Sequence, residues 1–525
     1  MKASRKWTAL AAILLAVLAV SMDGTILSVA VPTLATELKA SEAQLQWFSA
    51  GYFLVLAAGI LPAGRLGDRF GRKKLLVISV ALFGLGSIAC AISTTPTEFL
   101  IARLVLGLAG SGIVVMAVSA IVAVFDEAQR ARAIGLFSAA NFLALPLGPI
   151  LGGWILTHYW WGWVFLINAP LTVVGLVATI ALVPESRAPI PPRFDPIGIV
   201  ISTIGLVSLT YGFIDAGQNG WGSPGALGCM TGGVLVMAMF LLWERAETRR
   251  GNDPLLDLSL FALRSFTWGA ILSFLGGLTM IGVLFVMPQF FQGVLGTDAI
   301  SSGLRLLPLL AGLVVGALMA EKVAKLLGWR LTCVAGFVVA AIGLLLGAST
   351  DPRSSALFIA VWMFVYGLGL GLVTATAASA ALVKLERERS GAGSAIVQLI
   401  QKIAAPLGSA VLGSAVSAVY LSQLHLAGYP ASVASAARAS VFGGVAVARS
   451  LRSASLVAMV RGAFTSGLQM SLLVSACLAL TGVILAIVFM PGRREMQSIL
   501  STAHRDVNES EDVVATSSGT VHRPA

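Results

Sequence analysis

Charged residues are scarce in this sequence. Asp, Glu, Lys and Arg together make up 11% of its 525 residues, whereas 57% of the residues are hydrophobic. A soluble domain carries about 25% charged residues. The chain therefore has too few polar side chains to cover a soluble globule, and its composition indicates a polytopic membrane protein.

Sequence patterns typical of enzymes are also missing. The four cysteines each stand alone in a different apolar run, so there is no disulfide framework and no metal-ligand spacing. The sequence has no P-loop, nucleotide-binding pattern or catalytic-triad spacing, which argues against an enzyme and against ATP-driven transport. We expect no metal and no cofactor, and the basic residues are too dispersed for a nucleic-acid surface.

Long apolar runs recur along nearly the whole chain. A membrane-spanning helix needs about 20 apolar residues. Fourteen segments fit this length: 9–31, 47–63, 75–94, 99–121, 134–156, 163–183, 197–215, 224–243, 266–290, 303–320, 331–349, 354–378, 394–420 and 469–491. We therefore predict an all-α polytopic membrane protein with fourteen transmembrane helices.

The basic residues indicate the orientation of these helices. If the N-terminus lies inside, most Lys and Arg residues fall in cytoplasmic segments such as 65–74 and 245–264. The positive-inside rule then places both termini in the cytoplasm. The basic start of the chain also resembles a signal peptide, but the long first run and Asp23 within it favour an uncleaved first helix.

An even number of helices with both ends inside suits a transporter made of two six-helix halves and two additional helices. We place the N-terminal half at 1–194, an inserted pair of helices with its linker at 195–265, and the C-terminal half at 266–491. Within that half, 421–468 is an external segment that forms either amphipathic helices or a loose loop. The polar tail 492–525 is expected to be disordered and cytoplasmic.

A short basic turn separates the second and third predicted helices. It contains Gly64, Asp68, Arg69, Gly71 and Arg72, and Asp68 is its only acid. Glycines permit close backbone approach and positive φ. The charges alone also fit a generic positive-inside loop, but the spacing is less generic than the charges.

Two ionisable residues stand inside predicted spans of the first half. Asp23 and Arg103 both fall in the outer half of the bilayer. A nearby cation favours the charged carboxylate, whereas burial favours the neutral acid. Because these effects oppose each other, a small rearrangement can load or release a proton. The alternatives are that Asp23 only bonds helices together, or that the pair is a permanent structural ion pair.

The fifth predicted helix contains Gly148, Pro149, Gly152 and Gly153. Small residues let helices cross closely, and the Gly-Pro step removes one backbone hydrogen bond and creates a hinge. Generic helix packing accounts for scattered glycines but not readily for the full spacing.

Together these patterns resemble the fourteen-helix drug/proton antiporter branch of the major facilitator superfamily, the QacA-like and EmrB-like multidrug efflux transporters. The basic turn resembles the superfamily signature G-x-L-x-D-x-x-G-R-K, and the fifth helix resembles the motif of its antiporters. The resemblance implies the major facilitator fold, with Asp23 as the proton-coupling carboxylate and Arg103 as its partner.

The resemblance also implies roles for the basic turn. Asp68, with Arg69 and Arg72, would latch the two halves together in the outward-facing state, and Asp126 or Glu127 would be the acidic partner of the loop arginines. The chain departs from the family at Leu106, where Gln is frequent, and at Ala50, where some members carry an acid.

Aromatic, amide and charged side chains are the candidates for substrate binding, although each also fits a core or lipid-facing position. They are Asp23, Trp47, Tyr52, Asn141, Phe142, Gln289, Gln398 and Lys402. Arg305 is a further intramembrane cation, which we expect to reach toward the interface from near its helix end.

The leading hypothesis is a proton-coupled antiporter of a bacterial cytoplasmic membrane that exports lipophilic, cationic drugs or antibiotics. We expect it to act as a monomer whose partners are small lipophilic substrates, protons and membrane lipids. One alternative is a proton-coupled exporter of a specific endogenous metabolite, antibiotic or lipid, since Arg305 and Lys402 suit an anionic cargo. Another is a non-transporting membrane sensor, although the sequence has no soluble signalling domain.

Overall fold

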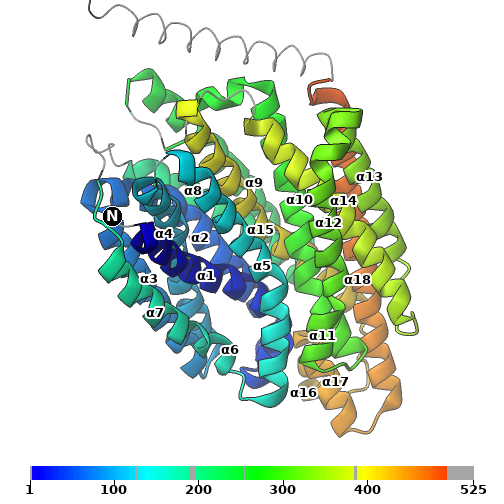
Figure 1. The fold of residues 1–525 in the computed structure, drawn as a ribbon. Coiled ribbons are helices and arrows are strands. Elements are labelled where there is room, and N and C mark those ends of the chain that lie inside the picture. The colour runs from blue at the N-terminus through cyan, green and yellow to red at the C-terminus, as the bar shows by residue number, and fades with distance from the viewer. Residues whose placement is uncertain are drawn as a thin grey trace, which may run out of the picture.

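A computed structural model describes residues 3–125, 127–187, 195–252, 255–256, 258–382 and 387–492, and Figure 1 shows its helical arrangement. All regular elements among these residues are helices, which confirms the all-α prediction. Residues 188–194, which precede the predicted inserted pair, lie outside the described residues. So do Asp126, the side chain of Glu127 and the tail beyond residue 492.

The described residues of the N-terminal half form seven helical segments. They are α1 (Ala3–Glu37), α2 (Glu42–Phe70), α3 (Arg72–Ile92), α4 (Pro96–Val124), α5 (Glu127–His158), α6 (Trp163–Leu166) and α7 (Asn168–Leu182). α1 packs against α5 and α7, and α4 packs against α2 and α3. Capping boxes at Ser41 and Thr95 fix the starts of α2 and α4.

The remaining elements are the inserted pair and the C-terminal half. They are α8 (Pro196–Asn219), α9 (Pro224–Arg249), η1 (Leu258–Ala262), α10 (Arg264–Gln289), η2 (Phe290–Val294), α11 (Ala299–Arg305), α12 (Leu307–Leu327), α13 (Trp329–Gly347), α14 (Ala356–Leu382), α15 (Arg387–Gln423), α16 (Ala431–Ala439), α17 (Val441–Ser450) and α18 (Ala454–Phe489). α14 packs between α12 and α13, and α10 packs against α15. The inserted helix α8 contacts both α15 and α2, so it touches both halves.

Thirteen helices in the described part of the chain are long and apolar enough to cross a membrane. The remaining predicted span, 134–156, lies within α5, a 32-residue helix that contains Pro146 and Pro149. The last span was predicted to begin at 469, but α18 begins at Ala454, where Ser453 accepts a hydrogen bond from the backbone of Leu456. That cap starts the helix well before its apolar part.

Two short helices, α16 and α17, lie in the segment 421–468. Their apolar residues Val433, Ala437, Val441 and Phe442 are buried in the main core cluster. Gly293 of η2 lies against Val441, so α17 packs on η2. These helices therefore belong to the packed body of the protein.

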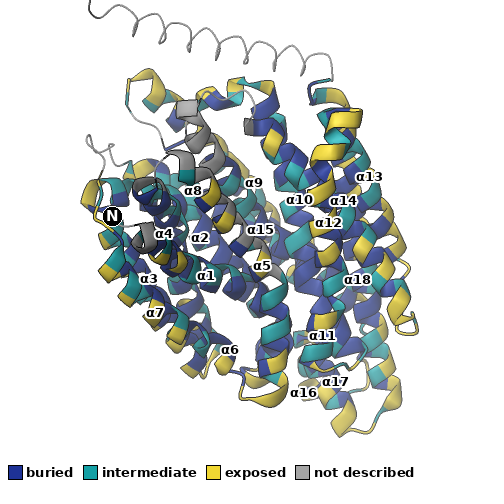
Figure 2. Cartoon of the chain, viewed as in Figure 1, coloured by how far each residue is buried: buried dark blue, intermediate teal, exposed yellow. Residues whose placement is uncertain are grey.

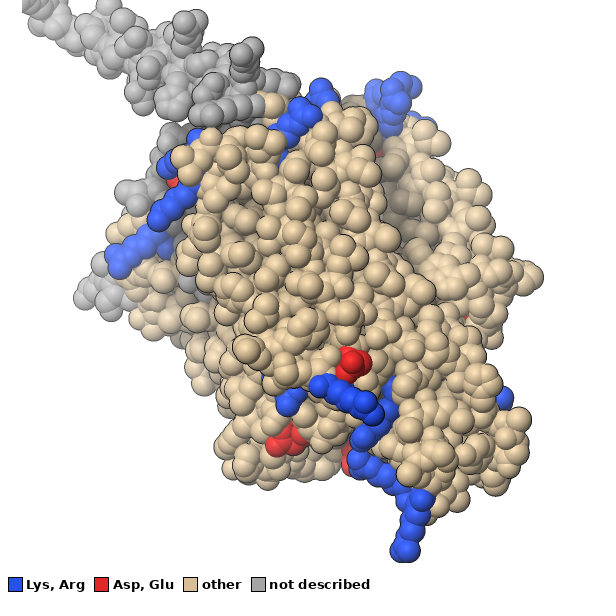
Figure 3. Space-filling model, turned by 90° about the vertical axis from the view of Figure 1, so that its right-hand side faces the viewer, with Lys and Arg blue, Asp and Glu red and all other residues tan. Residues whose placement is uncertain are grey.

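The core lies between the helices, and the outer faces are apolar. Figure 2 shows buried residues along the inner faces, while large apolar side chains such as Leu235, Leu318 and Leu357 are exposed. In the face drawn in Figure 3, charged side chains gather toward the two ends and leave a broad uncharged belt. An exposed apolar belt is the surface that lipid requires, so the chain is a multi-pass membrane protein.

Candidate transport site

Asp23 and Arg103 form an ion pair inside the N-terminal half. Arg103 Nη1 donates to Asp23 Oδ2 at 2.5 Å, and both side chains are fully buried. Asp23 lies in the middle of α1, and Arg103 lies two turns into α4. The structure therefore brings together the two intramembrane charges that the sequence predicts to pair, at one depth of the helix bundle.

The protein holds Arg103 from two further directions. Its Nε donates to the carbonyl oxygen of Phe48 at 3.2 Å, and its guanidinium carbon lies 4.2 Å from the centre of the Tyr52 ring. The Tyr52 hydroxyl in turn donates to the carbonyl oxygen of Val20 at 3.2 Å. Arg103 Nη2 is buried with no hydrogen-bond partner among the described residues. One N–H donor group of the guanidinium is therefore unused in this conformation.

A glycine allows α2 and α4 to approach closely at this point. A methyl group at Gly107 would meet the backbone of Tyr52 and lie 3.2 Å from the backbone nitrogen of Leu56. Leu106, where the family often has Gln, is fully buried, and its side chain packs against Gly86 of α3. The position where this chain has Leu in place of Gln therefore lies at the contact between α4 and α3.

Asn168 is a member of the site that the sequence analysis did not select. It begins α7, is 1% exposed, and its Nδ2 lies 3.5 Å from Asp23 Oδ1 and 3.4 Å from Ser87 Oγ. A single amide in an otherwise apolar run was the available sequence signal. The carboxylate of Asp23 thus accepts one hydrogen bond from a charged donor and one from a neutral donor. Both bonds favour its ionised form.

The glycines of α5 support the helix that carries Asp23. A methyl group at Gly148 would lie 3.0 Å from the carbonyl oxygen of Met22 and the backbone nitrogen of Ile26. Gly152 also contacts Ile26. Gly153 faces the other half, where a methyl group would lie 2.6 Å from the carbonyl oxygen of Ala299 in α11.

The glycine motif of α5 therefore makes two contacts. Gly148 and Gly152 allow α5 to pack closely against α1, and Gly153 touches the C-terminal half. Pro149 contributes to the same second contact, because Gly303 of α11 packs against its carbonyl group. A movement between the halves can thus be transmitted to α1 through α5.

The basic turn between α2 and α3 is bonded within its own half. Arg72 donates to Asp68 Oδ1 through Nε at 2.9 Å and Nη2 at 2.8 Å. Glu185, just after α7, accepts from the backbone nitrogens of Lys73 at 3.1 Å and Lys74 at 3.3 Å. A carboxylate at the start of α3 also matches the helix dipole.

Gly71 is the one residue of the turn whose conformation requires glycine. Its φ is 118°, and a methyl group there would lie 2.8 Å from Glu185 Oε1. Gly64 is less restricted, with Val115 at 3.6 Å, and Arg69 lies with its guanidinium 5.6 Å from the ring of Phe70. Asp126 and the side chain of Glu127, the expected partners of the loop arginines, lie outside the described residues.

Two of the substrate candidates, Asp23 and Tyr52, meet at Arg103, and the others that the structure describes lie on several helices. Trp47 lies near Tyr211 of α8, with ring centres 6.5 Å apart, and Asn141 accepts from Ser21 Oγ at 2.7 Å. Gln289 is buried at the outer end of α10. Gln398 and Lys402 are half-buried on α15.

The side chain of Phe142, another substrate candidate, is outside the described part of the chain. The guanidinium of Arg305, the further intramembrane cation, lies 5.7 Å from the centre of the Phe291 ring.

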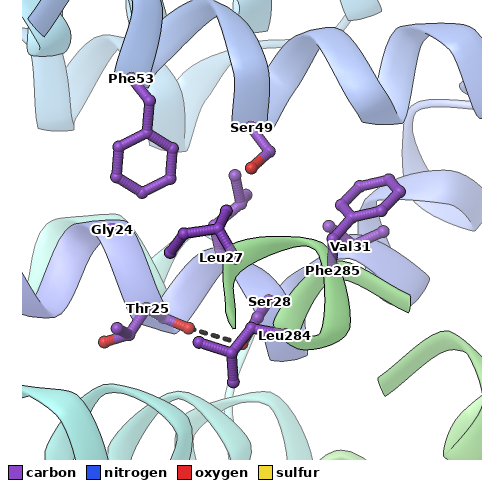
Figure 4. Close-up of a pocket in the computed structure, with 10 residues that line it drawn as sticks. Gly24, Thr25, Leu27, Ser28, Val31, Ser49, Phe53, Leu284 and Phe285 are labelled. Atoms are coloured by element: carbon purple, nitrogen blue, oxygen red, sulfur yellow. Dashed lines mark hydrogen bonds between the residues drawn. The ribbon is translucent and has the colours of Figure 1, made fainter. Parts of the chain in front are cut away.

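A small cavity lies between α1, α2 and α10, immediately beside the Asp23 site. It is lined by Gly24, Thr25, Leu27, Ser28, Val31, Ser49, Phe53, Ile281, Leu284 and Phe285, most of which Figure 4 labels. Its volume is about 20 Å³, which holds about one water molecule. A drug-sized ligand needs at least about 300 Å³, so this conformation is contracted at that point.

Comparison with known proteins identifies the family. The sequence profile of the Major Facilitator Superfamily matches residues 13–409. The chain belongs to this superfamily. It is 32% identical to "Multidrug efflux pump LfrA" of Mycolicibacterium smegmatis, covering 91% of this chain and 95% of that one. It is 31% identical to "Tetracenomycin C resistance and export protein" of Streptomyces glaucescens, covering 92% of this chain and 91% of that one.

Solved structures agree on the fold of this superfamily member. A bacterial homolog of the human lysosomal transporter Spinster, in an inward-facing and unoccupied conformation, matches with a TM-score of 0.66 at 15% identity. The match covers 93% of this chain and 98% of that structure. This match confirms the predicted major facilitator fold. The place of the chain in the cytoplasmic membrane is confirmed by its membership of the superfamily and by its apolar helices.

Proposed function

We propose that this protein is a proton-coupled antiporter that exports lipophilic, cationic drugs or antibiotics. The observation that carries the proposal is the buried Asp23–Arg103 pair beside the cavity between the halves. Burying an ionisable pair inside a membrane protein costs free energy, so such a pair indicates a functional site. The efflux and export relatives favour the same direction of transport.

The chemistry of the site supports exchange of a proton for a cation. With Arg103 and Asn168 in place, an ionised Asp23 carboxylate has a charged donor and a neutral donor as partners. A cationic substrate in an enlarged cavity competes with Arg103 for this carboxylate. A proton that neutralises Asp23 removes the attraction and releases the substrate, and the loss of the proton restores the pair.

The two halves transmit this exchange. α5 touches α1 through Gly148 and Gly152 and touches α11 through Gly153. In this conformation Asp68 is paired with Arg72 in its own turn. We propose that the turn engages the C-terminal half in the opposite conformation, so that Asp68→Asn slows turnover but leaves substrate binding nearly intact.

Replacement of Asp23 tests the function. Asp23→Asn keeps the size of the side chain and removes its charge. In proteoliposomes containing a pH-sensitive dye, addition of ethidium should move protons with the wild type and not with the variant. Glu37→Gln, an exposed acid at the outer end of α1, is the control and should behave like the wild type. An unchanged proton signal in Asp23→Asn would contradict the proposal.

A second candidate function is export of an anionic metabolite, and Lys402 favours it. Lys402 lies about three turns before Gly413 on α15, hence on the same face, and Gly413 contacts Gln46 of the N-terminal half. No described residue forms a hydrogen bond or ion pair with Lys402. Export of an anionic dye that is lost in Lys402→Gln, with no export of ethidium, would favour this candidate.

A further inference from the structure

A second buried carboxyl group lies at the outer end of the protein. Glu42 begins α2 directly after the capping residue Ser41, and it is 7% exposed. α2 starts on the external side, because the N-terminus of α1 is cytoplasmic. A carboxylate buried in an apolar setting is unfavourable unless a cation or several donors satisfy it, so its neighbours decide which protonation form the site suits.

The neighbours of Glu42 come from both halves. Gln289 Nε2 of α10 donates to Glu42 Oε1 at 3.4 Å. Gln46 lies one turn after Glu42 on α2 and donates from Nε2 to Ser417 Oγ of α15 at 3.2 Å. We call Glu42, Gln46, Gln289 and Ser417 the outer cluster. Its bonds join α2 to α10 and α15, and they close the two halves against each other.

Two acceptors in the outer cluster lack a donor. Gln46 Oε1 and Gln289 Oε1 are both buried without a hydrogen-bond partner among the described residues. An ionised carboxylate only accepts hydrogen bonds, whereas a protonated carboxyl group supplies one O–H donor. The outer cluster therefore lacks hydrogen-bond donors, and a proton on Glu42 would provide one.

No cation stabilises the ionised form of Glu42. Among the described residues, no Lys, Arg or His forms an ion pair with it. From α10 and within α2 the facing groups are the two neutral amides. From α15 the facing titratable group is the Tyr420 phenol, whose hydroxyl donates to the carbonyl oxygen of Ala437 in α16 at 2.6 Å.

We propose that Glu42 is a separate proton-binding site that closes the outer side of the protein when it takes up a proton from the external solution. The proton binds a carboxylate oxygen of Glu42. The amide of Gln289, whose Nε2 faces Glu42 in this conformation, then turns so that its Oε1 accepts a hydrogen bond from the new O–H. When the proton returns to the external solution, the anion needs water, which enters as the halves separate at this end. External acid therefore favours closure. This site goes beyond the proposed export function, because it requires neither substrate nor Asp23.

Distances across the outer side test the proposal. Spin labels at Thr36→Cys and Arg353→Cys report the separation of the halves, since both positions are exposed at the outer ends of opposite halves. Cys229 and Cys477, the two cysteines that are not buried, are replaced by Ala in this background. The full chain in lipid nanodiscs, without substrate, should show short distances at acidic pH and a shift to longer distances at alkaline pH.

Substitution of Glu42 should abolish that shift. In Glu42→Gln the amide supplies an N–H donor at every pH, so the short distance should persist across the range. Glu37→Gln, an exposed acid at the same end, should titrate like the wild type. Infrared spectroscopy should also show a protonated carboxyl band that is lost in Glu42→Gln and kept in Glu37→Gln.

The opposite results would overturn the proposal. Distances that do not change with pH in the wild type, or the same titration in Glu42→Gln, exclude Glu42 as the site. Absence of a carboxyl band specific to Glu42 excludes it as well. Because these measurements use no substrate, they stand apart from the Asp23→Asn transport assay, whose failure would remove the export function alone.

Discussion

The guanidinium of Arg103 lies over the ring of Tyr52, with 4.2 Å between its central carbon and the ring centre. The same arginine is ion-paired with Asp23, so α2 supports a contact that joins α4 to α1. A cation over an aromatic face contributes about 0.5–2 kcal/mol. Tyr52 thus helps to hold the guanidinium in place beside Asp23.

Substitutions of Tyr52 separate its ring from its hydroxyl group. Tyr52→Phe keeps the ring and loses the bond to Val20, which costs about 1 kcal/mol. Tyr52→Leu also loses the aromatic face, so we expect a larger fall in thermal stability and in ethidium transport. Unfolding midpoints in detergent and transport rates in proteoliposomes are the measurements. Equal effects of the two substitutions would show that the ring face contributes nothing.

Removal of one partner of the Asp23–Arg103 pair should cost more than removal of both. Arg103→Gln leaves Asp23 buried without its cation, and loss of one partner of a buried pair costs about 3–5 kcal/mol. Asp23→Asn combined with Arg103→Gln leaves two neutral amides that can bond each other. We expect a higher unfolding midpoint for the double variant than for Arg103→Gln alone, and a lower one would argue against a direct pair.

The sequence reveals the intramembrane charges but not which neighbours surround them. Asp23 and Arg103 stand out because each interrupts an apolar run. Glu42 does not stand out, because it follows Lys39 and Ser41 at a helix start and looks like a loop residue. Its burial depends on Gln289, 247 positions further along the chain. Only the packing of the two halves could place these residues together.

The substrate candidates fail to converge for a related reason. The apolar runs specify helices but carry almost no information about which face of each helix points inward, since lipid and core are both apolar. Trp47 therefore appeared equivalent to Tyr52, although the structure places Trp47 against α8 and Tyr52 against Arg103. Asn168 is an uncharged residue at a helix start, so the sequence does not reveal its bond to Asp23 of α1.

Substitution of Gly71 should destabilise the turn between α2 and α3. Its φ of 118° lies in a region that L-residues rarely adopt, and a methyl group would also meet the Glu185 carboxylate at 2.8 Å. Gly220 is a matched control, since its φ is 92° and nothing lies within 4 Å of a methyl group there. Backbone strain alone costs about 1–3 kcal/mol.

We therefore expect Gly71→Ala to lower the unfolding midpoint further than Gly220→Ala, and to slow transport. The larger fall in the midpoint should reflect the loss of the hydrogen bonds that the backbone N–H groups of Lys73 and Lys74 donate to Glu185. Equal losses for Gly71→Ala and Gly220→Ala would mean that the contact with Glu185 is unimportant.

Substitution of Gly148 should move the helix that carries Asp23. A methyl group at Gly148 would lie 3.0 Å from backbone atoms of Met22 and Ile26, which cannot shift unless α1 and α5 separate. Overpacking of this kind costs about 1–3 kcal/mol. Gly228 on α9 has nothing within 4 Å of a methyl group, and Gly228→Ala should be neutral or stabilise its helix by up to about 1 kcal/mol. Gly148→Ala should therefore lose substrate-driven proton movement while Gly228→Ala keeps it, and if both variants transport like the wild type, the close approach of α5 to α1 is not needed to position Asp23.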